Sequence, residues 1–138
     1  MNNGKNNWGV SFSHIQWLIR FLEGHDNIHS YDRSEDILFE LTRVKQGDKI
    51  KILCLNEYTF SSTKLRAALH EFPDICAVYI GGGWNGYTPE ALTLSAQRGV
   101  GIYVTDDLTG ALWRDNVNGY VRKDDRGDPI YRFSRESD

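Results

Sequence analysis

The sequence predicts a single α/β domain built around a mixed sheet, and two patterns in the chain lead to this fold class. Three short apolar runs begin near residues 50, 75 and 100, and a helical pattern fills each interval between them. Strand–helix–strand units form right-handed crossovers almost without exception, so we expect the three runs to lie parallel in one sheet. A chain of 138 residues supplies one hydrophobic core, so residues 1–138 are predicted to form one domain.

The helix boundaries follow from capping residues. A first helix is predicted between a cap at Ser13 and a stop at Gly24. A second helix follows the hydroxyl residues 61–63, and a third begins at Thr88, which is followed by the proline favoured in a first turn. Residues 1–7 are polar and rich in asparagine, and we expect them to be disordered.

Residues 34–46 fit two local structures. Ile37, Leu41 and Val44 share one face of a helix, whereas the alternation of Ile37, Phe39 and Leu41 is typical of a strand. In the second case the polar turn at residues 46–48 returns the chain into a strand over 49–56 and completes a hairpin. Local periodicity does not distinguish the helix from the hairpin.

A second hairpin is predicted near the C-terminus. Residues 117–134 contain two β-prone runs around an Asp/Gly/Pro turn, which predicts a hairpin appended to the domain.

Composition and charge restrict the classes of partner. The net charge is −3 and the pI is about 5.8, so the chain lacks the basic surplus of non-specific DNA-binding proteins. No apolar run approaches the ~20 residues of a membrane span, so no membrane partner is expected. Cys54 and Cys76 lie inside apolar runs and are interpreted as buried thiols in a reducing compartment. The N-terminal residues also lack a signal-peptide pattern, and these observations predict a cytoplasmic location.

Polar and aromatic residues follow the predicted parallel strands, at the edge where such sheets usually place ligand sites. Three consecutive glycines lie in the loop GGGWNGY, and local packing is expected to require fewer, which suggests a close approach to a partner. Cationic side chains from the next helix are expected nearby. The candidate binding residues are Asn56, Glu57, Tyr58, Lys64, Arg66, Trp84, Asn85 and Tyr87.

Acidic residues at the same edge suggest a possible Mg²⁺ site. Asp106 and Asp107 end the third parallel strand and, together with Glu57, could form a carboxylate cluster. The competing interpretation is that the paired aspartates cap the turn that follows them. His25 and His29 lie four residues apart, but a Gly-Asp-Asn stretch accompanies them and no metal site is expected there.

Three segments resemble Mrr-like restriction endonuclease domains. GYTPEALTLSAQRGVGIYVTDDL resembles their closing helix and strand, HIQWLIRFLEG resembles their opening helix, and EDILFELTRVKQGDKIKILCLNEYT resembles their catalytic hairpin. The resemblance covers roughly residues 13–112 in element order. It implies a three-layer, restriction-endonuclease-like fold of the PD-(D/E)XK superfamily, and it favours the hairpin over the helix for residues 36–56.

The resemblance also implies a site that has lost its catalytic pattern. That superfamily uses an Asp on one hairpin strand and Glu/Gln-x-Lys on the next to bind Mg²⁺ and activate water. By position the first acid is Asp36, whereas Cys54 and Asn56 occupy the places of the second acid and the lysine. Cysteine is a poor Mg²⁺ ligand and asparagine carries no charge. Glu57 and Lys64 are the candidate substitutes, so the catalytic candidates are Asp36, Glu57 and Lys64.

The leading functional hypothesis is therefore a non-catalytic module that binds nucleic acid or a nucleotide, which the resemblance connects with defence systems or mobile elements. The first alternative is a Mg²⁺-dependent phosphodiesterase that uses Asp36, or Glu57 with Asp106 and Asp107. The second alternative is a module that binds a protein partner. No cofactor is expected beyond Mg²⁺ in the enzymatic case, and the sequence leaves a homodimer open.

Overall fold

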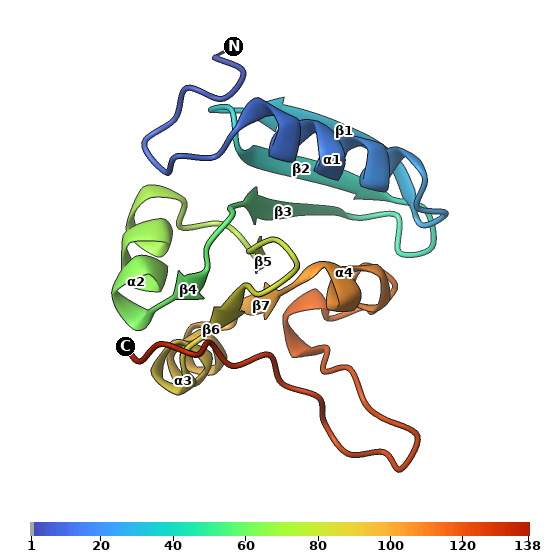
Figure 1. Cartoon of the computed structure of the whole chain (residues 1–138). Helices are drawn as coiled ribbons and strands as arrows, with labels where there is room; N and C mark the ends of the chain where they lie inside the picture. The colour runs from blue at the N-terminus through green and yellow to red at the C-terminus, as the bar shows by residue number, and fades with distance from the viewer. Residues whose placement is uncertain (1) are drawn as a thin grey trace.

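A computed structural model describes residues 2–138 as a five-stranded mixed sheet with helices on both sides (Figure 1). Each of the first three strands pairs antiparallel with the next, and the last two strands continue the sheet in parallel with the third. This arrangement confirms the predicted α/β class and the combination of an N-terminal hairpin with parallel strands. The strands, in their order across the sheet, are β1 (Ile28–Ser34), β2 (Leu38–Arg43), β3 (Lys49–Cys54), β5 (Ala77–Tyr79) and β7 (Gly101–Tyr103).

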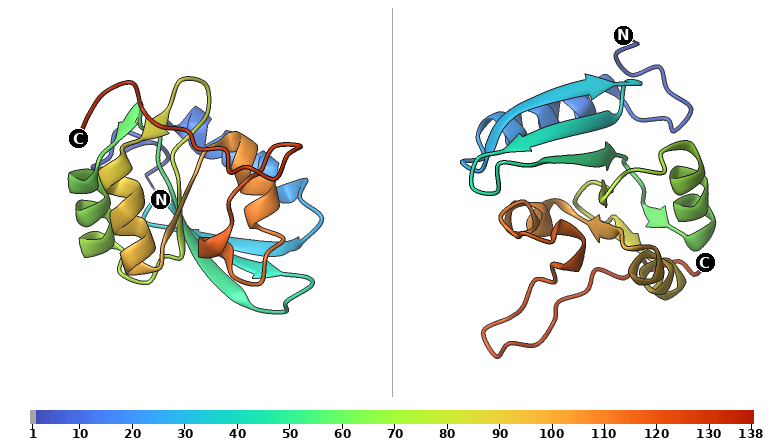
Figure 2. Two further views of the ribbon diagram at one scale, coloured as in Figure 1. Left: turned by 90° about the horizontal axis from the view of Figure 1, so that it is seen from below. Right: turned by 180° about the vertical axis from the view of Figure 1, so that it is seen from behind.

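The helices form two layers around this sheet. The crossover helices α2 (Ser62–Glu71) and α3 (Pro89–Arg98) pack side by side on one face. Helices α1 (Phe12–Glu23) and α4 (Thr105–Ala111) lie on the other face (Figure 2). Two crossovers of the same hand that progress in the same direction place both of their helices on one side, which explains this division. Within residues 2–138, no helix is long and apolar enough to cross a membrane.

The hairpin interpretation of residues 34–46 is confirmed. Strands β2 and β3 pair in antiparallel register, with Leu38 opposite Leu53 and Leu41 opposite Ile50. Alternate residues of β2 are buried, so the period-2 pattern follows the core. The turn before β2 contains Asp36, which has a positive φ of 70°.

The helix caps agree with the sequence except at α1. The predicted cap at Ser13 is wrong, since helix α1 is capped by Ser11, whose hydroxyl accepts a hydrogen bond from the His14 amide at 3.2 Å. Serines at both positions satisfy the capping pattern, and only tertiary packing selects between them. Thr88 caps α3 as predicted, and Gly99 ends it with a left-handed φ of 68°.

The predicted C-terminal hairpin forms only in part. Its first residues make a short 3-10 helix, η1 (Val117–Gly119). The chain then reverses around residues 124–128, and a single antiparallel bridge joins Lys123 to Pro129. Proline has no N–H to donate to a ladder, which limits the pairing. The segment continues alongside a small second sheet, whose strands are β4 (Thr59–Phe60) and β6 (Gly86–Tyr87), and Phe133 bridges to Tyr87 in parallel.

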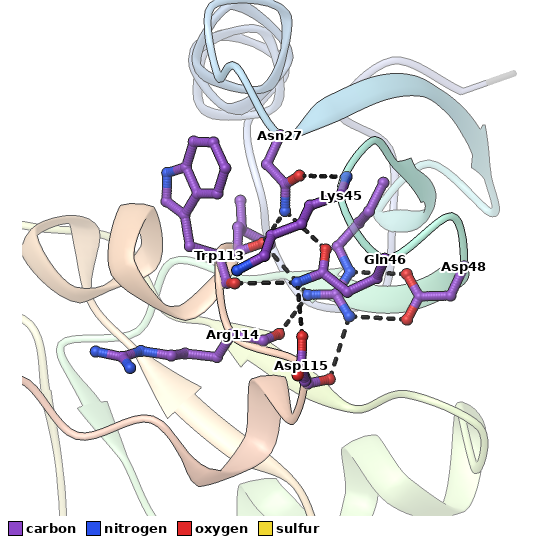
Figure 3. Close-up of polar contacts among 9 residues, drawn as sticks. Asn27, Lys45, Gln46, Asp48, Trp113, Arg114 and Asp115 are labelled. Atoms are coloured by element: carbon purple, nitrogen blue, oxygen red, sulfur yellow. Dashed lines mark hydrogen bonds and ion pairs between the residues drawn. The ribbon is translucent and has the colours of Figure 1, made fainter.

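Polar contacts join Asn27 and the turn between β2 and β3 to the segment that follows α4, and Figure 3 shows Gln46 beside Trp113 and Asp115. The buried Arg43 guanidinium forms an ion pair with Asp48 at 2.7 Å and donates to the carbonyls of residues 112, 114 and 115. The remaining carbonyl, at residue 113, accepts from Gln46, and Asn27 also donates to the carbonyl of residue 112. These contacts hold residues 112–115, directly after α4, against the hairpin. The first turn of α4 lines the cavity described next.

Candidate functional site

A cavity of about 480 Å³ lies at the carboxyl edge of the parallel strands, and we call it the carboxyl-edge cavity. Five parts of the chain form it: helix α1, the segment after β3, the end of β5 with the glycine loop, the start of α4, and the C-terminal segment. Its volume falls within the range of small-molecule sites, and parallel sheets commonly bind ligands at this edge. The lining residues used below are His14, Trp17, Asn56, Tyr79, Thr105, Asp106 and Arg132.

An aromatic wall forms one side of the carboxyl-edge cavity. The rings of His14 and Tyr79 are nearly parallel, with an angle of 2° between their planes and 5.5 Å between centroids. Trp17 also lies nearly parallel to Tyr79, at 5.8 Å. The capping of α1 at Ser11 sets this wall, because it places His14 and Trp17 three residues apart on the same face of the helix.

His14 presents a hydrogen-bond acceptor to the cavity. Its Nε2 atom lies 2.8 Å from the Leu55 carbonyl, which can only accept, so Nε2 carries the proton. The ring is therefore the tautomer in which Nδ1 has a free lone pair. Burial lowers the pKa of His14 below its ordinary value, and the hydrogen bond to Leu55 offsets this only in part. The imidazole is accordingly neutral at pH 7.

Two hydroxyl groups lie at the ends of neighbouring strands. The Tyr79 hydroxyl and Thr105 Oγ1 are 2.9 Å apart, which is a hydrogen bond. Burial raises the pKa of Tyr79 to about 12, although the bond to Thr105 acts in the opposite direction. The phenol therefore remains protonated at physiological pH and is a donor, not a nucleophile.

Packing requires two of the three consecutive glycines, which confirms the expectation that it requires fewer than three. Gly81 has a φ of +94°, and a Cβ there would lie 2.6 Å from the Asn85 amide. A Cβ on Gly82 would lie 2.7 Å from Thr105 Oγ1. A Cβ on Gly83 would meet nothing within 4 Å, and its positive φ of 61° is what favours glycine there. Packing and backbone conformation together therefore account for the three glycines.

One cation reaches the cavity from the C-terminal segment. The Arg132 guanidinium donates to the Gly83 carbonyl at 2.7 Å and forms an ion pair with Asp106 at 3.1 Å. Asp106 is about half exposed, so this pair is open to solvent and contributes little to stability. Arg132 is therefore a partly exposed positive charge beside the aromatic wall.

Some of the predicted binding residues come together. Asn56 lines the cavity and accepts a hydrogen bond from Asn85 at 2.7 Å, so two predicted residues meet there. Glu57 and Lys64 form an ion pair at 2.9 Å, so each side chain neutralises the charge of the other. Arg66 is exposed on α2, outside the set of residues that line the cavity.

The predicted aromatic residues differ in exposure. Tyr58 and Trp84 are exposed, and the Arg135 guanidinium lies 4.3 Å from the Trp84 ring centroid. Tyr87 is only 4% exposed and its hydroxyl accepts from the Arg132 amide, so its ring is not exposed beside the glycine loop, and its binding role stays a prediction. The C-terminal segment covers Tyr87 and excludes it from solvent, and local sequence gives no sign of this long-range contact.

The candidate metal ligands lie in separate environments. Asp106 faces Arg132, Glu57 faces Lys64, and the Asp107 carboxylate lies 3.1 Å from Arg122. Across residues 2–138, no three Asp, Glu, His or Cys side chains form a group that could hold a metal ion. The two aspartates occupy the first turn of α4, but neither caps it, since the N-cap position is Val104 and no side chain makes a capping hydrogen bond. The competing interpretation of them as capping residues is therefore wrong.

Asp36, the candidate first acid, has every side of its carboxylate occupied. It accepts hydrogen bonds from the Gly4 amide at 2.8 Å, from Asn6 at 2.9 Å and from Arg33 at 2.8 Å. Burial acts to raise the pKa of Asp36, but these bonds and the Arg33 charge outweigh it and lower the pKa. Residues 2–7, for which the sequence predicts disorder, lie against this carboxylate.

Cys54 lies close to Asp36, where the resemblance places the second acid. Burial raises the pKa of Cys54 to about 12, and the nearby Asp36 charge adds to this effect. The thiol is fully buried and remains protonated, so it supplies no metal ligand.

The sequence did not predict five residues of the site. Thr105 follows a parallel strand just as Asn56 does, so the rule that selects Asn56 also selects it. His14 and Trp17 lie in the predicted first helix and belong to no motif, and Tyr79 has the pattern of an ordinary core residue in an apolar run. Arg132 comes from a segment with no regular secondary structure, and no local pattern predicts where it lies.

Comparisons of this chain with protein-family models, with curated proteins and with solved structures find no match.

Proposed function

We propose that this domain binds a nucleotide at the carboxyl-edge cavity and does not cleave it. The observation that carries the proposal is the pairing of an aromatic wall with a single cation in a cavity of nucleotide size. The half-buried rings of His14 and Trp17 supply the accessible part of the wall, with the buried Tyr79 ring stacked on them, and Arg132 supplies the charge. The resemblance of the sequence to nuclease domains also supports a nucleotide as the class of ligand.

A nucleotide fits the chemistry of the cavity in three respects. Base stacking on aromatic rings tolerates any base and contributes about 1–3 kcal/mol. Arg132 can turn from the exposed Asp106 carboxylate toward a phosphate, which accepts two parallel N–H bonds from a guanidinium. Neutral His14 offers Nδ1 as an acceptor for a base amino group or a sugar hydroxyl.

The cleavage alternative has less support. Metal-dependent phosphodiester hydrolysis needs carboxylates that share an ion, and Asp106 is the only carboxylate residue among those that line this cavity. At the position that the resemblance assigns to the lysine, Asn56 is uncharged and bonded to Asn85. Asp36 is bonded to Arg33 and to the N-terminal residues.

Isothermal titration with AMP and with UMP tests the proposal, using wild type, His14→Ala and His29→Ala. His29 is an exposed histidine on β1 and is the matched control. We expect both nucleotides to bind wild type and the control equally, and loss of the His14 ring to weaken binding roughly 5- to 100-fold, from the value of one stacked base. Absence of binding to wild type, or equal affinity of the two variants, would contradict the proposal.

A further inference from the structure

Trp84 lies next to the rim of the carboxyl-edge cavity without lining it. Gly83, the residue before it, is part of the lining. Trp84 is 71% exposed, a larger fraction than that of any other large apolar residue among residues 2–138. Tryptophan rings bury a large apolar area when a partner covers them, which is why they are enriched at binding surfaces. The ring is therefore a candidate contact for a part of the ligand that extends beyond the cavity.

A cation is stacked on this ring. The Arg135 guanidinium lies 4.3 Å from the Trp84 ring centroid, and a ring so widely exposed keeps its other face open to a planar group. Arg135 is exposed, and across residues 2–138 no carboxylate forms an ion pair with it. The acids that follow it in the chain bind elsewhere, since Glu136 accepts from Thr59 and Asp138 from Thr88. The charge of Arg135 is thus available to an external anion.

Backbone pairing holds the segment that carries both Arg132 and Arg135. The Tyr87 amide donates to the Arg132 carbonyl at 3.1 Å, and the Ser134 amide donates to the Tyr87 carbonyl at 2.8 Å. The two guanidinium groups contact consecutive residues of the glycine loop, the first at the residue 83 carbonyl and the second at the residue 84 ring. Consecutive Cα atoms are about 3.8 Å apart, so two cations and an open ring lie together at the rim of the cavity.

The charges around this rim limit the ligand to a few phosphates. Asp106 pairs with Arg132, and Glu57 pairs with Lys64, so the rim has no large positive surplus. This agrees with the net charge of −3 and excludes the extended phosphate contacts of a duplex-binding surface. The bases of a duplex are also stacked on one another, whereas the bases of a single strand are free to stack on an aromatic ring.

We propose that the ligand of the carboxyl-edge cavity is a single strand of nucleic acid, and that the base of its second nucleotide stacks on Trp84. This inference rests on the proposed nucleotide site, which holds the first base. The phosphodiester between the two nucleotides lies beside Arg132, and Arg135 contacts the next phosphate of the strand. Stacking accepts any base, so the sequence preference of this second position is weak.

Isothermal titration with AMP, with ApA and with hexaadenylate tests the inference, using wild type, Trp84→Ala and Trp113→Ala. Trp113 is 42% exposed, lies outside the lining of the cavity and is the matched control. Trp84→Ala should weaken ApA binding roughly 5- to 100-fold, from the value of one stacked base, and change AMP binding less than about twofold. Trp113→Ala should change neither, and hexaadenylate should bind wild type at least as tightly as ApA.

The salt dependence of hexaadenylate binding tests the role of Arg135. Each phosphate of a single strand that a protein neutralises contributes about −0.7 to the slope of log K against log salt concentration. Arg135→Gln should therefore make the slope shallower by roughly 0.7. Arg126→Gln, which removes an exposed arginine from the turn at residues 124–128, should leave the slope unchanged.

The outcomes separate this inference from the proposed function. Failure of AMP to bind wild type would refute the nucleotide site and the single strand with it. If AMP binds but Trp84→Ala and Trp113→Ala bind ApA equally, the nucleotide site stands and the second position is refuted. Weaker binding of hexaadenylate than of ApA would also overturn the inference, because it would identify a free dinucleotide as the ligand.

Discussion

Replacing Asp36 separates a structural role from a catalytic one. Its carboxylate is 2% exposed, accepts three hydrogen bonds and is paired with Arg33 at 2.8 Å. Removing one partner of a buried pair costs about 3–5 kcal/mol, and alanine at a φ of 70° costs about 1 kcal/mol more. At roughly 3–4 °C per kcal/mol for a chain of this size, Asp36→Ala should lower Tm by roughly 12–24 °C.

The assay is thermal unfolding followed by circular dichroism, with Asp32→Ala as the matched control. Asp32 is exposed on β1, and its replacement should change Tm by less than about 2 °C. Asparagine tolerates the left-handed backbone at this position, so the Tm of Asp36→Asn should lie between those of Asp36→Ala and Asp32→Ala. Asp36→Asn should bind AMP like wild type. A Tm for Asp36→Ala within about 3 °C of wild type would refute the structural role.

The pH dependence provides a second check on Asp36. Its pKa is lower in the folded state than in the unfolded chain, so the stabilisation is fully present above the ordinary value of about 4. It is lost as the pH falls through the folded-state pKa. The difference in unfolding free energy between wild type and Asp36→Asn should therefore be constant from pH 5 to 7 and shrink below about pH 4.

Two further predictions concern Arg43 and His14. Arg43→Met should reduce the unfolding free energy by about 3–5 kcal/mol in urea titrations, because it leaves Asp48 unpaired and removes the side-chain donor to the carbonyls of residues 114 and 115. The exposed Lys45→Met should change it by less than about 0.5 kcal/mol, and equal effects of the two substitutions would show that Arg43 does not hold the segment after α4. The pKa of His14 is lower in the folded state than in the unfolded chain, so stability should decrease as the pH falls below about 6.5, where the unfolded chain takes up the proton first. His14→Gln should remove that decrease, measured as Tm between pH 5 and 8, and an unchanged slope would show that His14 does not cause it.

The sequence predicts the parallel half of the sheet better than the hairpin, for physical reasons. The runs that become β5 and β7 are apolar on both faces and are flanked by strong caps such as Thr88, so local signals agree with the fold. Residues 34–46 match both a helical and a strand period. Only pairing with β3 decides between them, and this is a tertiary contact.

The candidate site is predictable only where it follows the strand ends. Asn56 is found by its place after β3, and it does line the cavity. His14 and Arg132 come from α1 and from the C-terminal segment, which meet the sheet edge through long-range packing. For Tyr87 the sequence errs in the opposite direction. Its position beside the glycine loop suggests an exposed ring, but Phe133 packs against that ring.

The most direct test of non-catalytic nucleotide binding uses one NMR sample containing the protein, the dinucleotide ApA and Mg²⁺. The account predicts that the amide signals of Asn56 and Thr105 shift to saturation, while the ³¹P signal of the phosphodiester stays intact over a day. Appearance of a phosphomonoester signal in wild type, and its loss in Asp36→Asn, would contradict the account and establish the domain as a phosphodiesterase.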